Sequence, residues 1–208
     1  MATLRVLLVA LLVPLAAAQE ERKPPVDRPA EIPDESTYDI GPERAIEFAF
    51  SGDGLSLGYR DIFQRGNGYL NLGLFVGDDD DYALSARLVR IGQPRSDTPL
   101  GLGIGLGLIG ASVDVSDEEL LALTITGSAD YRIPLDYPLR IGIEVSYAPE
   151  AANFFDGEEV LDAQARAELE LSSWAYAFAG YRHFEVELED RGEHELDTAL
   201  QVGVRLGI

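Results

Sequence analysis

From residue 45 to residue 208, apolar side chains alternate with polar or small ones at a period of two. Between residues 139 and 147 the odd positions carry Leu, Ile, Val and Tyr, and the even positions carry Arg, Gly, Glu and Ser. The same alternation occurs in 68–76, 120–132 and 160–171. Successive side chains of a strand point to opposite faces, so this pattern predicts strands with one apolar and one polar face. The expected fold class is therefore all-β.

The alternating runs predict about ten strands, and most reach the roughly 9–11 residues that cross a bilayer at a tilt. The first two are short and could instead form one kinked strand around 51–54. The predicted strands are 45–51, 54–61, 68–77, 82–92, 99–113, 120–132, 138–148, 160–171, 174–187 and 194–208.

The connections between these strands differ in length and charge. Tight turns are expected at 135–137 and 172–173, whereas longer acidic loops occupy 148–159 and 188–193. Outer-membrane barrels have short periplasmic turns and longer outside loops. The sequence therefore predicts a small antiparallel transmembrane β-barrel of about 8–10 strands, in the outer membrane of a Gram-negative bacterium. The alternative is a soluble secreted β-protein, whose apolar faces would point inward.

Residues 99–110 read PLGLGIGLGLIG and contain the letters G-x-G-x-x-G at 105–110. A phosphate-binding loop needs its glycines between a strand and a helix. Here the glycines lie within the alternating run, after Pro99. We interpret the segment as a strand whose Leu and Ile side chains face lipid and whose glycine face leaves room in a crowded lumen. No nucleotide or other cofactor is expected.

The N-terminal residues have the features of a targeting segment. Arg5 precedes the apolar run 6–15, and Ala16 to Ala18 provide an A-x-A site, which predicts a cleaved signal peptide over 1–18. Residues 19–44 are rich in proline and charge, so we expect a flexible periplasmic leader before a barrel domain at 45–208. The absence of cysteine excludes a lipoprotein anchor, disulfides and thiolate metal sites.

The net charge of the chain and its C-terminal strand indicate which binding partners to expect. A formal net charge of −21 disfavours nucleic-acid binding because the surface repels phosphates. Apolar residues at alternate positions from Leu200 to Ile208 resemble the C-terminal signal that outer-membrane assembly machinery recognises, although that signal usually ends in an aromatic residue. The expected partners are therefore outer-membrane lipid and the barrel assembly machinery.

The C-terminal half also resembles the YfaZ-type outer-membrane proteins. The resemblance rests on four short motifs: YAPE at 147–150, LDAQAR at 161–166, GYRH at 180–183 and VGVRLG at 202–207. It implies a small outer-membrane barrel and brings no catalytic residues to this chain.

The polar faces of the strands predict a charged lumen. A barrel of about eight strands is just wide enough for its interior to be filled by side chains, so opposite charges are expected to pair and plug it. The alternative is a narrow small-solute pore with the same residues at its constriction. The predicted lumen network contains Arg87, Arg132, Arg140, Glu144, Arg166, Glu168, Glu170 and Arg205.

Three further groups of residues are candidate sites. A two-residue turn at 172–173 would place Asp162 opposite His183, with Glu185 on the same face. A His beside carboxylates is the arrangement that a barrel hydrolase would use, but no serine motif accompanies it. Asp78 to Asp81 lack the ligand spacing of a calcium loop and are interpreted as a solvated hairpin tip. An aromatic girdle is expected near the periplasmic strand ends, formed by Tyr131, Tyr137, Trp174 and Tyr176.

Taken together, these features predict an integral outer-membrane protein of structural or passive role, with a largely plugged polar lumen. No enzymatic activity, catalytic residue or metal site is expected. A narrow pore, a barrel hydrolase and a soluble secreted β-protein are the alternatives.

Overall fold

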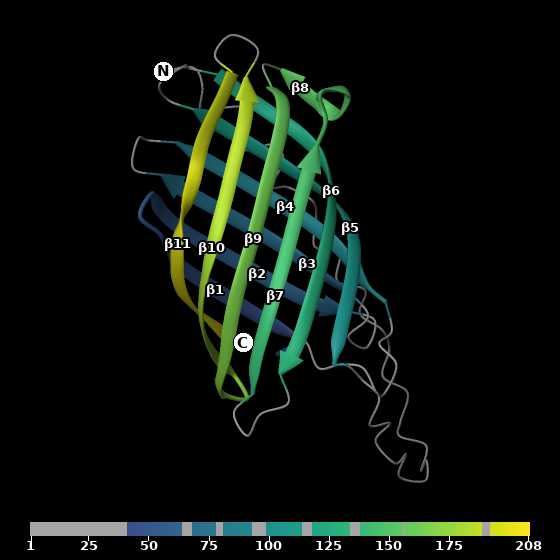
Figure 1. Ribbon diagram of the computed structural model, residues 1–208, viewed down its shortest axis with the longest axis vertical. Helices are drawn as coiled ribbons and strands as arrows, with labels where there is room; N and C mark the ends of the chain where they lie inside the picture. Colours follow the sequence, from purple (N-terminus) through teal and green to yellow (C-terminus); the bar gives the residue numbers. More distant parts are fainter. Residues whose placement is uncertain are drawn as a thin grey trace, which may run out of the picture. The chain divides into compact units, whose positions relative to one another are not determined.

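The computed structural model describes residues 41–63, 68–77, 81–92, 99–113, 118–133, 138–155, 157–188 and 192–208. Over these residues ten strands of 7–16 residues form a closed antiparallel barrel, with a short eleventh strand at one end (Figure 1). The predicted all-β fold class and barrel architecture are confirmed. The predicted signal peptide, residues 19–40 of the predicted leader, 78–80 and Tyr137 lie outside the described residues.

Each predicted strand is present, with ends that differ by a few residues. The strands are β1 (Arg44–Phe50), β2 (Gly54–Phe63), β3 (Gly68–Gly77), β4 (Tyr82–Ile91), β5 (Leu100–Val113), β6 (Glu118–Ile133), β7 (Leu139–Ala148), β8 (Asn153–Phe155), β9 (Gly157–Ser172), β10 (Ala175–Leu188) and β11 (Gly192–Gly207). A 3₁₀ turn, η2 (Glu150–Ala152), precedes β8. Neither η2 nor β8 was predicted.

The first two strands are separate and pair with each other across a tight turn. Ser51 N–H donates to the carbonyl of Gly54 (3.0 Å), and Gly54 N–H donates to the Ser51 hydroxyl (3.0 Å). Because this turn closes the hairpin within a few residues, the alternative of one kinked strand is wrong.

The ten long strands follow one another around the barrel, and the first pairs with the last. Every pairing is antiparallel, and β1 closes the barrel against β11 in a register that sets Ala45 opposite Gly207. Strand β7 pairs with β9, whereas β8 pairs with residues 120–122 of β6, beyond the end of β7. We call the end that contains β8 the upper end, as it is drawn in Figure 1.

Strand β5 shows why the glycine-rich run forms part of the wall. Its Leu and Ile side chains point outward, and Ile104 is 69% exposed. The glycines face the lumen, where a Cβ on Gly105 would lie 2.9 Å from Val89 Cα and one on Gly107 would lie 2.6 Å from the Thr124 hydroxyl. Side chains would not fit there without displacing β4 or β6. The run is a strand, as predicted.

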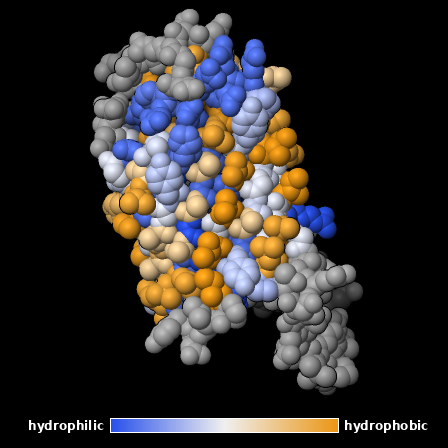
Figure 2. Space-filling view, viewed as in Figure 1, coloured by the Kyte–Doolittle hydropathy of each residue, from blue (hydrophilic) through white to orange (hydrophobic). Residues whose placement is uncertain are grey.

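The outer surface is apolar over much of the wall. On the face formed by β7, β9, β10 and β11, apolar side chains cover the lower and middle part and hydrophilic ones gather at the upper end (Figure 2). The exposed apolar residues on these strands and on β5 and β6 include Leu102, Ile104, Leu106, Leu123, Ile125, Ile141, Ile143, Leu171, Leu200 and Val202. No helix among the described residues is long and apolar enough to span a membrane.

The interior changes character along the barrel. At the upper ends of β3 to β7 and β9 to β11, the inward side chains form one buried apolar cluster, which we call the apolar cap. Its members are Phe75, Ala83, Ile109, Ala111, Val113, Leu120, Ala122, Ala148, Val160, Phe184, Val186, Leu188 and Leu196. Below the cap the inward side chains are mostly polar and charged. This inversion, apolar inside and hydrophilic outside at the upper end, was not predicted.

Candidate functional site: the charged lumen

The lumen contains two groups of ion pairs, and the first lies directly below the apolar cap. We call it the upper group: Arg87, Glu144, Asp162, Arg182 and Asp197. Asp162 is its centre, because it accepts hydrogen bonds from Arg87 and from both Nε and Nη2 of Arg182 (2.9 Å each). Arg182 also reaches Asp197 (3.5 Å), and Arg87 reaches Glu144 (3.8 Å). The group joins strands β4, β7, β9, β10 and β11 across the lumen.

The second group lies nearer the lower end. We call it the lower group: Glu47, Arg140, Arg166, Glu168 and Arg205. Nη1 of Arg166 donates to both carboxylate oxygens of Glu47 (3.1 Å each), and Nε of Arg205 donates to the same carboxylate (3.3 Å). Glu168 pairs with Arg205 and lies 3.8 Å from Arg140. Because each charge has a partner, the desolvation cost of burial is offset in part by Coulomb attraction.

Arg182 connects the ion pairs to the apolar cap. Its guanidinium lies over the rings of Phe184 (4.6 Å to the centroid) and Phe75 (5.5 Å). These two rings meet edge to face with centroids 6.5 Å apart. The aromatic pair comes from β3 and β10, on different sides of the barrel, so cap and ion pairs together fill the lumen at this level.

A cavity of about 90 Å³ remains among these side chains. Its lining includes Arg60, Asn71, Ser85, Ser128, Gln164 and Gln201 together with members of both groups and the two cap rings. A single water needs roughly 10–15 Å³ of such space, so the cavity can hold several waters. A second pocket of about 10 Å³ lies between Arg132, Glu170 and Tyr176.

The predicted lumen residues fall into two sets. Six of them belong to the two groups: Arg87, Arg140, Glu144, Arg166, Glu168 and Arg205. The other two, Arg132 and Glu170, lie at the small lower pocket, where Arg132 is exposed and Glu170 half-buried. Neither forms an ion pair with another residue of the described ranges.

Four charged members of the groups were not in the predicted network: Glu47, Asp162, Arg182 and Asp197. Glu47 alternates with the outward Ile46 and Phe48, so the period-two pattern of β1 carried the signal. Asp197 lies at an irregularity in the pairing of β10 with β11, where the register shifts between Phe184 and Glu185. No sequence pattern predicts that shift.

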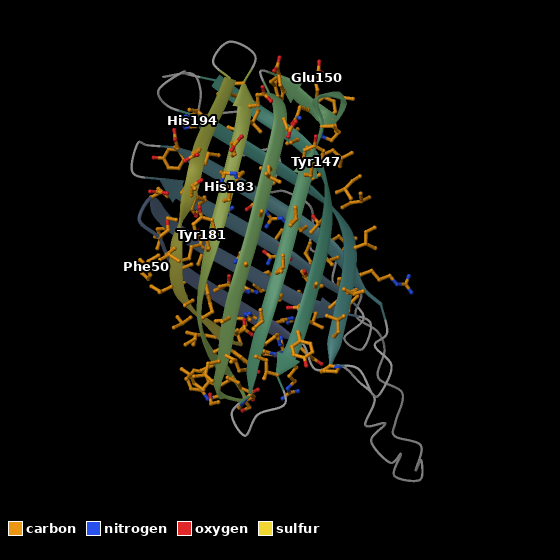
Figure 3. The ribbon with its side chains drawn as sticks, viewed as in Figure 1. Phe50, Tyr147, Glu150, Tyr181, His183 and His194 are labelled. Atoms are coloured by element: carbon orange, nitrogen blue, oxygen red, sulfur yellow. The ribbon has the colours of Figure 1, made fainter. Side chains whose placement is uncertain are left out.

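The expected pairing of Asp162 with His183 is wrong. The turn occupies Ser173 and Trp174, and a register shift next to it sets His183 opposite Ala163, one residue away from the predicted partner. A slip of one residue exchanges the faces of a strand. Asp162 therefore faces the lumen, while His183 lies on the outer side, bound to Thr198 (3.1 Å) and Glu185 (3.1 Å), below His194 in Figure 3.

The expected girdle is also partly wrong, because Tyr176 is buried in the lumen under the guanidinium of Arg205. Trp174 and Tyr131 are exposed on the outer surface near the lower end. Among the described residues no three His, Asp or Glu side chains are grouped to hold a metal ion.

A closed antiparallel barrel with an apolar exterior and a charged interior defines the class of this protein: a β-barrel of the outer-membrane type. No family model matches the chain, and no curated protein matches it. Among solved structures it is similar to a chain described as "KdgM porin", with a TM-score of 0.42 and 10% identity, over 79% of this chain and 98% of that one.

Proposed function

We propose that this chain is an integral outer-membrane protein of structural or passive role, whose lumen is closed to steady ion flow. The observation that carries the proposal is the apolar cap over the ion pairs. In the lumen below the cap, opposite charges pair instead of lining an open water column. No step of this function needs a catalytic residue, and the protein is proposed to be a non-enzyme.

The apolar cap gives the barrel a second barrier besides the ion pairs. Phe75, Phe184 and Ile109 are at most 2% exposed. A hydrated ion would have to displace these side chains, and an ion moved into an apolar medium pays a large desolvation cost. The cavity of about 90 Å³ ends against Phe75 and Phe184.

Planar-bilayer recording of the purified mature protein tests this proposal. We expect no steady conductance steps from the parent protein, with insertion verified by heat-modifiable gel migration of the same preparation. The double variant Phe75→Ser, Phe184→Ser should produce leak currents because it opens the cap. Leu72→Ser, on the exposed outer face of β3, is the matched control and should remain silent. Large, stable, ion-selective steps from the parent would overturn the proposal.

A narrow small-solute pore is the second candidate. The observation that favours it is the cavity of about 90 Å³, which can hold several waters and is lined by charges of both signs. In that case the parent itself conducts, and Arg87→Ala or Arg182→Ala changes ion selectivity as well as stability.

Location, family and assembly partners belong to the same proposal. The apolar exterior supports an outer membrane with lipid as the partner of the wall. The outward Leu200, Val202 and Val204 of β11 support recognition of this strand by the assembly machinery. The location in a Gram-negative bacterium and membership of the YfaZ-type proteins rest on the sequence resemblance. Fractionation with detergent tests the location, since the mature chain should partition with outer membrane.

A further inference from the structure

One arginine points outward from the apolar wall of the barrel. Arg90 is exposed, whereas Val89 and Ile91 on either side of it are buried in the lumen. Its outward neighbours are apolar: Leu88, two residues before it on β4, and Ile104, directly opposite on β5, are 55% and 69% exposed. Within the part of the chain that the structure describes, no ion pair involves Arg90. A charge on a lipid-facing wall is costly unless an anion pairs with it.

The height of Arg90 on the wall follows from the register of the strands. Arg90 belongs to a row of paired residues that begins at Gly68, the lower end of β3, and continues through Ile104 to His183 on β10. His183 lies in the upper half of the barrel (Figure 3), so the row climbs from β3 towards β10. Strands about 4.8 Å apart and tilted by about 40° give roughly 3 Å of height per strand. Arg90 therefore lies roughly 3 Å below Ile104.

The lower edge of the apolar stripe is within reach of the Arg90 guanidinium. Leu100, the lowest outward residue of β5, precedes Ile104 by four residues, which correspond to roughly 10 Å of height. Leu100 thus lies roughly 7 Å below the Cα of Arg90. An extended arginine side chain covers this distance while its methylene stem stays on apolar surface. The charge then reaches the level of the lipid headgroups, which border the hydrocarbon core of a bilayer.

The outward acids of the described strands do not lie at this level unpaired. Asp61 is already bound to Arg44 (3.5 Å). Each of the others is next to a residue of the apolar cap, at the upper end: Glu119, Glu159, Glu185, Glu187 and Glu195. A second copy in the same membrane orientation would hold these acids at the same heights. The described strands of a neighbouring copy therefore offer no acid to Arg90, and the lipid itself is the remaining source of an anion.

We propose that Arg90 binds the phosphate group of a phospholipid in the leaflet at the lower end of the barrel. The acyl chains of this lipid lie along Leu88, Leu102 and Ile104, which are all exposed on the wall. A guanidinium suits a phosphate because it donates two parallel hydrogen bonds to it. This inference rests on the proposed membrane location, and it holds whether or not the lumen conducts.

Native mass spectrometry of the purified mature protein in a non-ionic detergent tests the site, with phosphatidylglycerol as the probe. The complex with one lipid should be at least several-fold less abundant for Arg90→Gln than for the parent protein. Arg90→Lys should retain part of the binding, because it keeps the charge but loses the two parallel hydrogen bonds. Arg44→Gln is the matched control: this arginine is also exposed at the lower end but is already paired, so the variant should bind as the parent does. Equal retention by the parent and Arg90→Gln would refute the proposal.

Two further ligands identify the group that Arg90 recognises. Diacylglycerol with the same acyl chains lacks the phosphate, so the parent and Arg90→Gln should retain it equally. If the parent prefers diacylglycerol as strongly as phosphatidylglycerol, the phosphate is not recognised and the proposal is wrong. Inorganic phosphate at the concentration of the lipid should not displace phosphatidylglycerol. Full displacement would show that the site takes a free anion instead of a lipid.

Unfolding in phosphatidylglycerol vesicles tests the sign of the effect. A partnerless arginine on the lipid face destabilises a barrel, so its replacement by glutamine would raise the folded-to-unfolded ratio. An arginine bound to phosphate stabilises the barrel, so Arg90→Gln should lower this ratio several-fold. A higher or unchanged ratio in a parent protein that inserts normally would overturn this inference alone. Failure of the parent to insert into the vesicles would overturn the proposed membrane location as well.

Discussion

Replacing Ile104 by arginine tests the assignment of the lipid-facing surface. Ile104 is the middle of five outward apolar residues on β5, which run from Leu100 to Leu108. Four residues on each side correspond to about 13 Å of strand, or about 10 Å of height at the usual barrel tilt. The stripe is thus about 20 Å tall, close to the roughly 25 Å apolar band of such barrels. Ile104 is expected near the bilayer midplane.

The expected cost follows from this position. An arginine on the lipid face costs about 2–4 kcal/mol at the midplane and about 0–1 kcal/mol near the interface. Arg90 lies directly opposite Ile104 on β4, so repulsion between like charges adds about 0.2–1 kcal/mol. Leu106→Arg lacks this addition, because Leu106 is flanked by Leu88 and Ile125. Ile104→Arg should therefore be slightly more costly than Leu106→Arg.

The measurement is urea unfolding in lipid vesicles, monitored by the fluorescence of Trp174, the one tryptophan of the chain. Ser112→Arg is the matched control: it lies on the same strand and face, eight residues above Ile104 and beyond the apolar stripe. Its free energy of unfolding should change by less than about 1 kcal/mol. If Ile104→Arg and Ser112→Arg have the same effect, the outward face of β5 does not contact lipid and the reasoning fails.

Three further predictions concern processing and packing. Mass spectrometry of the mature protein should find Gln19 at its N-terminus, and an intact Met1 would contradict the signal peptide. Gly105→Val should cost about 1–3 kcal/mol in the same unfolding assay, because its side chain meets Val89, whereas Gly127→Val, with no atom within 4 Å, should be neutral. Phe184→Ala should cost about 3–5 kcal/mol by leaving a cavity in the cap, and an effect below 1 kcal/mol would show that the cap is loosely packed.

The strands could be predicted from the sequence because alternation is a local property. Over most of β5, β6, β7 and β9 one face carries apolar side chains and the other carries small or polar ones, so the existence of each strand can be predicted without its neighbours. Register depends on them. At the turn between β9 and β10, Ser172 pairs with Ala175 but Glu170 pairs with Tyr176, which leaves Leu171 as an extra residue. Nothing in the letters SSW shows that the turn lies one residue later than predicted or that Leu171 is inserted, and together these two changes set Asp162 opposite Phe184 instead of His183.

The charged lumen was predictable only in part. Arg87, Arg166 and Arg205 lie on polar faces of clearly alternating strands, and such faces must meet inside a barrel whose outside is apolar. Their partners are harder to identify, because ion pairs form across the lumen between strands far apart in sequence. Arg87 and Asp162 are 75 residues apart, and Arg205 and Glu47 are 158 apart. Closure of the barrel brings them together, and periodicity contains no information on that geometry.

The apolar cap follows from the length of the strands. Strands β6, β9 and β11 have 16 residues, more than the roughly 9–11 that cross a bilayer. The excess lies at the upper end, where Glu185 and Glu187 point outward and Val186 and Leu188 point inward. An outer face with this charge suits water, and a barrel wall in water needs an apolar interior, as a soluble β-protein does. Where the outside is lipid, the apolar side chains face outward and the charges must pair inside. The same alternating pattern therefore suits lipid and water, because the apolar face points outward where the wall meets lipid and inward where it meets water. At both levels the side chains of the barrel wall itself fill the lumen.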